Sequence, residues 1–480
     1  MKEKKEIINI IYNILYKMLN VLFPLISAGI IARRLLPYGV GKVSTAQNIV
    51  TYFTFLAPMG LPIYGVREIA KAKGKELDKL FSECLIINAI STSLCIIVYY
   101  NMIRVVPYFK GEKLLYIVAG LSIIFNYMNI EWFYQGKGEY KYIAVRSMAV
   151  KMMMFLAIII FVKNPNDYIR YSFIYCIATG GNYLFNMLHL RTYSIKLQLN
   201  NLELLKHIRP LFILLASNIA VELYSLVDTT MLSFLCDENT VAYYTNSMKI
   251  VKVAVFVIAA IGGTTLQRIS PLIQEKEYNK VMNIFSDIVK FMLILAIPCM
   301  LGLVVTAPNV IWVLYGKHYM KAVTTIRILS GLFLVLPFSN FIGTQILVAF
   351  NKESKVLFSQ VIAAITNIFL NIILINMFKQ NGAAIASVIS EFVVLGMMVF
   401  FTKKEIKCMI GRKFLLQIFI ASMVMLMVIC FIIEVASSYI GGLILAIVIG
   451  ICVYFVVLII ERNEYALVIS NRIKCWLSNK

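Results

Sequence analysis

Charged side chains are scarce in this sequence. Only 15% of its 480 residues are Asp, Glu, Lys or Arg, whereas 60% are hydrophobic. This shortage of charge excludes a water-soluble protein, because a soluble domain needs more polar surface than this. Apolar segments of membrane-spanning length recur from end to end instead, and about 20 helical residues cross the hydrocarbon of a bilayer. The sequence therefore predicts an all-α integral membrane protein.

Residues that could ligate metals are also few. The three His residues lie far apart in sequence, and the nine Cys residues are scattered without a Cys-x-x-Cys pair. This pattern favours neither a metal centre nor a disulfide framework, so we predict no cofactor. Residues 39–42 (GVGK) lack the spacing of a Walker loop, and no Gly-x-Ser-x-Gly elbow occurs. Transport would then draw on an ion gradient, the membrane potential or the substrate gradient.

Acidic residues are outnumbered by basic ones, 24 against 46, which gives a formal net charge of +22. The Lys and Arg residues lie between apolar spans rather than on one basic face, so they favour anionic lipid heads over nucleic acid. Alternate connections, starting with residues 2–9, hold about 31 of them and the opposite connections about 12. By the positive-inside rule both termini are predicted to be cytoplasmic.

About 14 transmembrane helices are predicted, joined by connections too short for a soluble catalytic domain. The first is expected to remain as an anchor rather than to be removed as a signal peptide. Pro298 and Pro337 are expected to kink their helices. The predicted spans are 10–31, 43–63, 81–103, 114–134, 145–162, 168–188, 211–235, 241–263, 284–306, 323–350, 356–378, 382–402, 414–436 and 440–460.

An internal repeat indicates two related halves. Residues 65–81 (GVREIAKAKGKELDKLF) match residues 266–282 (LQRISPLIQEKEYNKVM) at a constant offset, with Arg67 opposite Arg268. Each half would hold six helices in the same orientation. We therefore predict an N-terminal six-helix lobe at 1–205, a second six-helix lobe at 206–405, and two additional helices with a cytoplasmic tail at 406–480.

The span at 211–235 carries two carboxylates, Glu222 and Asp228, at a depth where an isolated charge is unfavourable by several kcal/mol. At about 100° per residue, they share half of the helix circumference with Ser, Asn, Tyr and Thr side chains. This pattern favours a helix that lines a transport cavity. The alternative is a polar contact between helices, with the carboxylates paired to Lys or Arg.

Several cations near or within the spans are candidates to bind a phosphate or diphosphate. Snorkelling to the membrane interface is the alternative, and it fits Arg33 and Arg34 better than Lys17. Glu391 is a candidate proton carrier, although a paired structural carboxylate is the other interpretation. The candidate substrate-binding cations are Lys17, Arg33, Arg34, Arg146, Lys249 and Lys252.

Four segments, in order along nearly the whole chain, resemble Wzx-type O-antigen and capsule repeat-unit flippases: 32–71, 131–151 (EWFYQGKGEYKYIAVRSMAVK), 226–252 and 367–391. The resemblance implies a fold like the multidrug and toxin extrusion (MATE) transporters. It also implies a substrate, an undecaprenyl-diphosphate-linked oligosaccharide moved from the cytoplasmic to the outer leaflet of the bacterial cytoplasmic membrane. Asp228 and Lys249 take candidate roles from the family pattern. Leu36-Pro37-Tyr38 departs from it, since a Gly-Pro turn is usual there.

Other functions remain alternatives. Within the same superfamily these are an ion-coupled drug exporter and a lipid-linked peptidoglycan-precursor flippase. A membrane enzyme, such as a polysaccharide polymerase or acyltransferase, would want a larger external loop with catalytic Arg or His. A scaffold would explain neither the intramembrane charges nor the repeat. The resemblance further implies membrane lipids, a polymerase and glycosyltransferases as partners.

Overall fold

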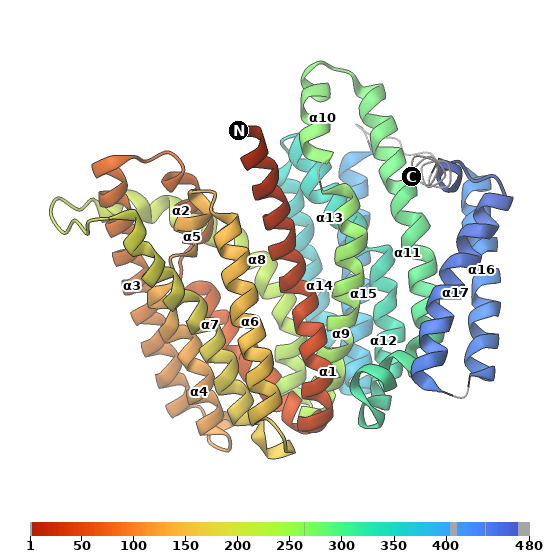
Figure 1. Ribbon diagram of the computed structural model, residues 1–480, viewed down its shortest axis with the longest axis horizontal. Coiled ribbons are helices and arrows are strands. Elements are labelled where there is room, and N and C mark those ends of the chain that lie inside the picture. The colour runs from red at the N-terminus through yellow and green to blue at the C-terminus, as the bar shows by residue number, and fades with distance from the viewer. Residues whose placement is uncertain (1, 264, 404–409, 437, 469–480) are drawn as a thin grey trace. The chain divides into compact units, whose positions relative to one another are not determined.

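The computed structural model describes residues 2–263, 265–403, 410–436 and 438–468, without the side chains of 2–11, 13–17, 19–22 and 216–225. Every regular element in those ranges is a helix (Figure 1). Contacts divide the chain into two compact units, Met1–Ala242 and Tyr243–Lys480. The lobes predicted above rest on sequence symmetry rather than on contacts, and that division stays a prediction.

The first unit contains, in chain order, α1 (Lys2–Leu56), α2 (Leu61–Ile69), α3 (Gly74–Val105), η1 (Pro107–Phe109), α4 (Lys113–Ile124), η2 (Phe125–Met128), α5 (Glu131–Gly136), α6 (Tyr140–Phe161), η3 (Pro165–Asp167), α7 (Tyr168–Leu190), η4 (Arg191–Tyr193) and α8 (Leu204–Leu235). Within this unit α1 packs against α6 and α8, and α7 against α4 and α6.

Helix α9 (Glu238–Ala259) crosses the boundary between the units. The second unit continues with η5 (Ala260–Gly262), α10 (Thr265–Gln274), α11 (Tyr278–Tyr315), η6 (Lys317–Ala322), α12 (Val323–Leu329), η7 (Ser330–Leu334), α13 (Leu336–Phe341), the π-helix η8 (Ile342–Leu347), α14 (Glu353–Phe378), α15 (Gln380–Thr402), α16 (Arg412–Val435) and α17 (Tyr439–Ile460).

The helices have the length and surface of membrane spans. In the described part of the chain, ten stretches are long and apolar enough to cross a bilayer, and two shorter apolar helices accompany them. One stretch, Phe23–Ile69, contains the predicted span 43–63 and part of the span 10–31, so the predicted number of 14 is approximate. Along α17, Ile444, Ile447 and Ile451 are about half exposed on one face, as lipid contact requires. The all-α membrane fold is confirmed.

Helix α1 is interrupted at Leu36, which has φ 59° and ψ 174°. Before the turn, Phe23 packs edge-on against Phe155 of α6. After it, Asn48 donates a hydrogen bond to Thr230 of α8 at 2.7 Å. The part of α1 before the turn therefore packs against α6, and the part after it packs against α8. A side chain at positive φ is strained, and glycine would relax it.

Replacing Leu36 with Gly is expected to raise the stability of the protein by about 1 kcal/mol, because it removes the strain of positive φ. Thermal unfolding of the purified protein in detergent measures the effect. Leu36→Ala is the matched control, since it shortens the side chain and keeps the strain. If the unfolding temperature of the Gly variant is equal to or below that of the Ala variant, the proposed backbone strain at Leu36 is contradicted.

Two predicted spans are broken by local structure. The span at 114–134 becomes α4, η2 and α5, because Asn129 leaves the helical region between them. The span at 323–350 becomes four short helices. Pro337 occupies the first turn of α13, where its missing N–H is tolerated, so the expected kink inside a helix is wrong there.

The two C-terminal helices pack against each other and against α11 (Figure 1). The hydroxyl of Tyr454 on α17 donates to the carbonyl of Ile294 at 2.8 Å, and both residues belong to a buried cluster with Ile418 and Met425 of α16. The predicted pair of additional helices is confirmed as part of this fold. They are joined to their unit by a core of their own.

The repeated segment adopts the same local structure in both copies. Arg67 lies in α2 and Arg268 in α10, and each helix is followed by a turn and then a long helix. Gly74 (φ 54°) and Lys276 (φ 59°) provide the left-handed residue at the respective turns. The constant offset in the sequence thus corresponds to a common helix–turn–helix.

Candidate functional site

A buried ion pair lies among α5, α6 and α7. The side chain of Arg146 is 5% exposed, and its Nη2 lies 2.9 Å from Oε2 of Glu131. Its Nη1 donates to the side-chain carbonyl of Asn186 on α7. A guanidinium removed from water needs such partners, because an unpaired buried charge is unfavourable by several kcal/mol. The predicted substrate role of Arg146 is untested, but its position inside the first unit is now defined.

Local structure explains how Glu131 reaches that arginine. It occupies the first turn of α5, two residues after the extended residue Asn129, and a carboxylate is favoured there by the helix dipole. The indole N–H of Trp132 donates to the carbonyl of Asn129 at 3.1 Å and fixes the start of the helix. Nε of Arg146 and Nδ2 of Asn186 are buried donors without an acceptor.

A polar cavity of about 170 Å³ lies in the same unit, between α1, α4, η2 and α7. Hydroxyl and amide groups and tyrosine rings line it, and no charged side chain does. Such a lining suits the hydroxyl groups of a sugar, which both donate and accept hydrogen bonds. The polar lining residues are Gln47, Thr51, Thr54, Ser122, Asn126, Tyr175, Thr179 and Tyr183.

Asn126 is held rigidly at the wall of that cavity. Its Nδ2 donates to Oδ1 of Asn88 at 3.0 Å and to the hydroxyl of Thr92 at 2.8 Å. In return, Nδ2 of Asn88 donates to the backbone carbonyl of Asn126 at 2.8 Å. Nδ2 of Asn129 donates to the side-chain oxygen of Asn126 at 2.9 Å. These bonds satisfy an amide that would otherwise be unpaired in an apolar setting.

Sequence reasoning missed this cavity. The available signal was spacing: Gln47 and Thr51 are one turn apart on α1, and Tyr175, Thr179 and Tyr183 follow one face of α7. Our sequence-based candidates were chosen for charge, whereas the cavity is lined by neutral groups.

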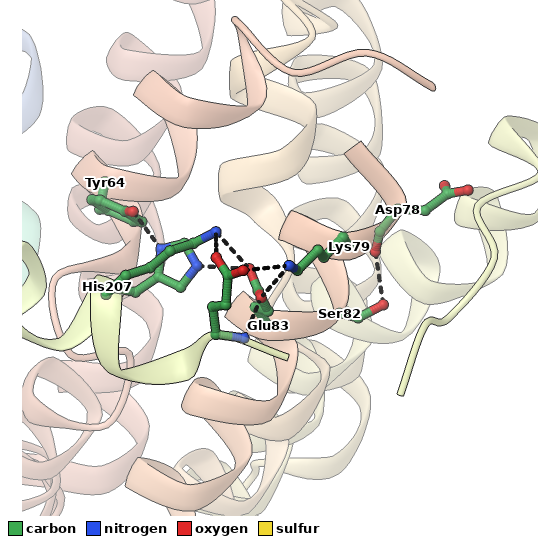
Figure 2. Close-up of polar contacts among 8 residues, drawn as sticks. Tyr64, Asp78, Lys79, Ser82, Glu83 and His207 are labelled. Atoms are coloured by element: carbon green, nitrogen blue, oxygen red, sulfur yellow. Dashed lines mark hydrogen bonds and ion pairs between the residues drawn. The ribbon is translucent and has the colours of Figure 1, made fainter. Parts of the chain in front are cut away.

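A second buried network joins α2, α3 and α8 (Figure 2). The hydroxyl of Tyr64 contacts Nδ1 of His207, whose Nε2 lies 2.7 Å from Oε2 of Glu83. The backbone N–H of Glu203 donates to the other oxygen of Glu83 at 2.7 Å. The Glu83 side chain is only 1% exposed and that of His207 2%. The network is thus sealed from water.

Two lysines lie at the solvent-facing edge of this network. Lys79 lies 3.1 Å and Lys206 2.8 Å from carboxylate oxygens of Glu203, and both approach Glu83 within 4.0 Å. Hydrogen bonds from the ammonium groups of Lys206 and Lys79 lower the pKa of Glu203 to about 2. Glu203 therefore keeps its charge throughout the physiological range. Nothing in the sequence singled out Glu83, which lies 124 residues from His207.

Glu83→Ala is expected to lower the free energy of unfolding by about 3–5 kcal/mol, because it leaves His207 buried without its partner. Lys206→Ala is the control: that side chain is 49% exposed, so its loss should change stability by less than about 1 kcal/mol. Denaturant unfolding of the two purified variants in detergent gives the comparison. Equal losses would show that the buried pair is not the stronger contact.

The other predicted cations occupy different settings. Nη1 of Arg34 donates to the carbonyls of Ile158, Ile159 and Val162 at 3.1, 2.7 and 2.6 Å, so it caps the C-terminal end of α6. This arrangement favours a structural role for Arg34. Arg33 is exposed. The side chains of Lys17 and Glu222 lie outside the described residues.

The remaining predicted residues lie on α8, α9 and α15. Asp228 is buried in the first unit, whereas Lys249 belongs to the second, where its Nζ donates to Asn246 at 3.0 Å. Their pairing stays a prediction. Lys252 is exposed, and Glu391 is buried. Among the described residues, no group of three or more His, Cys, Asp or Glu side chains could hold a metal ion.

The C-terminal part of α8 contacts α1 through polar side chains. Thr230 accepts from Asn48 and shares a 2.6 Å hydrogen bond with Tyr52, and Ser233 bonds Thr45 at 2.9 Å. The polar face predicted for this helix is centred on Glu222 and Asp228 rather than on Thr230 and Ser233. The choice there between cavity lining and a polar contact between helices stays a prediction.

Comparison with known proteins adds three findings. The profile of the family described as "Polysaccharide biosynthesis protein" matches residues 7–267, more than half of the chain. A "Putative O-antigen transporter" of Shigella dysenteriae is 23% identical over 384 residues, which cover 78% of this chain and 94% of that protein. A protein of the same description from Escherichia coli (strain K12) is 22% identical over 411 residues, covering 83% and 96%.

Among solved structures, "Lipid II flippase MurJ, inward closed conformation" is similar, with a TM-score of 0.79 at 18% identity. The match covers 95% of this chain and 100% of that chain. At this identity the likeness concerns the fold. The family match over residues 7–267 confirms the family resemblance predicted from the sequence.

Proposed function

Because the chain belongs to the polysaccharide biosynthesis protein family, we propose that it moves a lipid-linked oligosaccharide across a membrane. The observation that carries this proposal is the alignment, over nearly their whole lengths, with proteins described as O-antigen transporters. The fold shared with a lipid II flippase supports it. No bond is made or broken in this process, so the protein acts as a transporter rather than as an enzyme.

The proposed substrate is an oligosaccharide repeat unit on undecaprenyl diphosphate. It would pass by alternating access from the cytoplasmic to the outer leaflet of the bacterial cytoplasmic membrane. The neutral polar cavity offers hydroxyl and amide partners to sugar groups. A polymerase would consume the product, and glycosyltransferases would supply the substrate.

A diphosphate requires cations. Arg146 is the candidate whose surroundings are best defined, since its guanidinium pairs with Glu131. An arriving diphosphate would compete with Glu131 for that guanidinium. Lys17, Arg33, Lys249 and Lys252 stay candidates for the same role; Arg34 is already engaged as a helix cap. Protonation of Glu222, Asp228 or Glu391 would couple transport to a proton gradient.

A drug exporter and a peptidoglycan-precursor flippase are the alternatives. The relatives described as O-antigen transporters favour the oligosaccharide over both. Each alternative would also have a different role in the cell. An exporter protects against toxic compounds, and a peptidoglycan-precursor flippase maintains the cell wall.

Deletion of the gene tests the proposal. Undecaprenyl-linked oligosaccharide is expected to accumulate in the cytoplasmic leaflet while surface polysaccharide disappears, because synthesis continues and transport stops. Mass spectrometry of extracted lipids measures the first effect, and surface staining measures the second. Restoration by the wild-type gene on a plasmid is the control.

Two results would overturn the assignment. Normal surface polysaccharide in a deletion strain with no second flippase gene would exclude the proposed substrate. Loss of cell-wall integrity, or a rise in drug sensitivity with intact polysaccharide, would favour one of the alternatives.

The proposed orientation has both termini in the cytoplasm, as the distribution of Lys and Arg indicates. A single Cys at Gly74, in a variant lacking the natural cysteines, is therefore expected to resist a membrane-impermeant thiol reagent in intact cells. A single Cys at Asn381 should react. Permeabilised cells serve as the control, because both positions should then react. The reverse labelling pattern would show that the protein has the opposite orientation in the membrane.

A further inference from the structure

A second polar pocket, of about 360 Å³, lies at one end of the first unit. Three connections form it: the turn within α1, the η1–α4 junction, and the α8–α9 junction. All three belong to the set predicted to face outward. The size lies at the lower end of the range for small-molecule sites, about 300–1,000 Å³, which suits a single sugar unit.

Lys42 is the central side chain of this outer pocket. It is 8% exposed and forms an ion pair with Glu112. Its Nζ lies 4.1 Å from the ring centroid of Tyr38 and 4.9 Å from that of Tyr168. The hydroxyl of Tyr168 donates to the second carboxylate oxygen of Glu112 at 3.0 Å. These contacts fix one wall of the pocket before any ligand arrives.

The opposite wall is fixed as well. The hydroxyl of Tyr108 donates to the carbonyl of Ser233 at 2.7 Å, and its ring packs on that of Phe234 with centroids 4.6 Å apart. A Cβ on Gly41 would lie 1.8 Å from the carbonyl oxygen of Glu238, so only glycine permits this approach of α1 to α9. The pocket is thus bounded by ordered contacts.

Two tyrosine rings remain available at its edge, since Tyr38 is 50% and Tyr108 41% exposed. Aromatic residues at such a depth commonly anchor a protein at the membrane interface. Anchoring alone does not account for Lys42, Glu112 and Glu238, which line the same hollow. Aromatic faces beside hydrogen-bonding carboxylates match the two surfaces of a sugar, its apolar C–H face and its hydroxyl edge.

We propose that this outer pocket binds one saccharide unit, neutral or amino, of the transported glycan on the outward side of the membrane. This inference rests on the proposed function and orientation. The charged lining side chains are one lysine and two glutamates, so the pocket favours a neutral or cationic sugar over a uronate or a phosphate. A sugar subsite in this outer pocket would be separate from the cavity between α1 and α7, and it adds a substrate-binding position to the proposed function.

Saturation-transfer NMR on the full-length protein in lipid nanodiscs, prepared without glycoside detergents, tests the subsite. The probes are methyl glucopyranoside, glucosamine and glucuronic acid. The first two are expected to bind and the third to bind at least about tenfold more weakly. Tyr38→Ala should weaken binding about tenfold, because it removes the stacking face. Glu238→Gln should narrow the preference for glucosamine over glucuronic acid.

Tyr278→Ala is the matched control, since Tyr278 is a 47% exposed tyrosine at the start of α11, outside the pocket, and binding should not change. The inference is overturned if no probe binds, if glucuronic acid binds best, or if Tyr38→Ala and Glu238→Gln both bind like the wild type. If deletion still traps the lipid-linked oligosaccharide, such a result removes the subsite alone and the flippase function stands.

Discussion

A bilayer offers no water to the polar groups of a chain that crosses it, so each group must find its partner inside the protein. The first unit follows this constraint at two prominent places. Arg146 is compensated by Glu131, and Asn126 is satisfied by Asn88, Thr92 and Asn129. These bonds hold the helices in register. They also place amides and hydroxyls around a cavity, so groups that stabilise the helices also form the cavity lining.

The helices could be predicted from the sequence because hydrophobic length alone decides whether a segment crosses a membrane. Their interruptions could not. Helix α4 ends before Asn126, whose bonds to Asn88 and Thr92 on α3 hold η2 in place. That contact joins residues distant in the sequence. At Leu36, the sequence did reveal a departure from the usual turn, and the structure shows the strained conformation that follows from it.

The sequence singled out Arg146 because its charge stands out against an apolar background, although its substrate role stays a prediction. Glu131 lies only 15 residues away and could be considered with it. The pairing of Glu83 with His207 depends on the packing of α3 against α8, which no local pattern encodes. Neutral residues such as Gln47 and Thr51 are common in contacts between helices, so residue type alone does not mark a cavity.

The junction of α2, α3 and α8 depends on one imidazole ring with a partner on each nitrogen. A phenol hydroxyl can donate to a neutral imidazole or accept from a charged one, and a carboxylate accepts from either form. Tyr64 and Glu83 can therefore keep both contacts with His207 whether or not the ring carries an extra proton. The imidazole therefore acts as a cross-link, because its two nitrogens tie α2 and α3 to α8. A shift of any one of these helices would have to break a hydrogen bond that is buried from water.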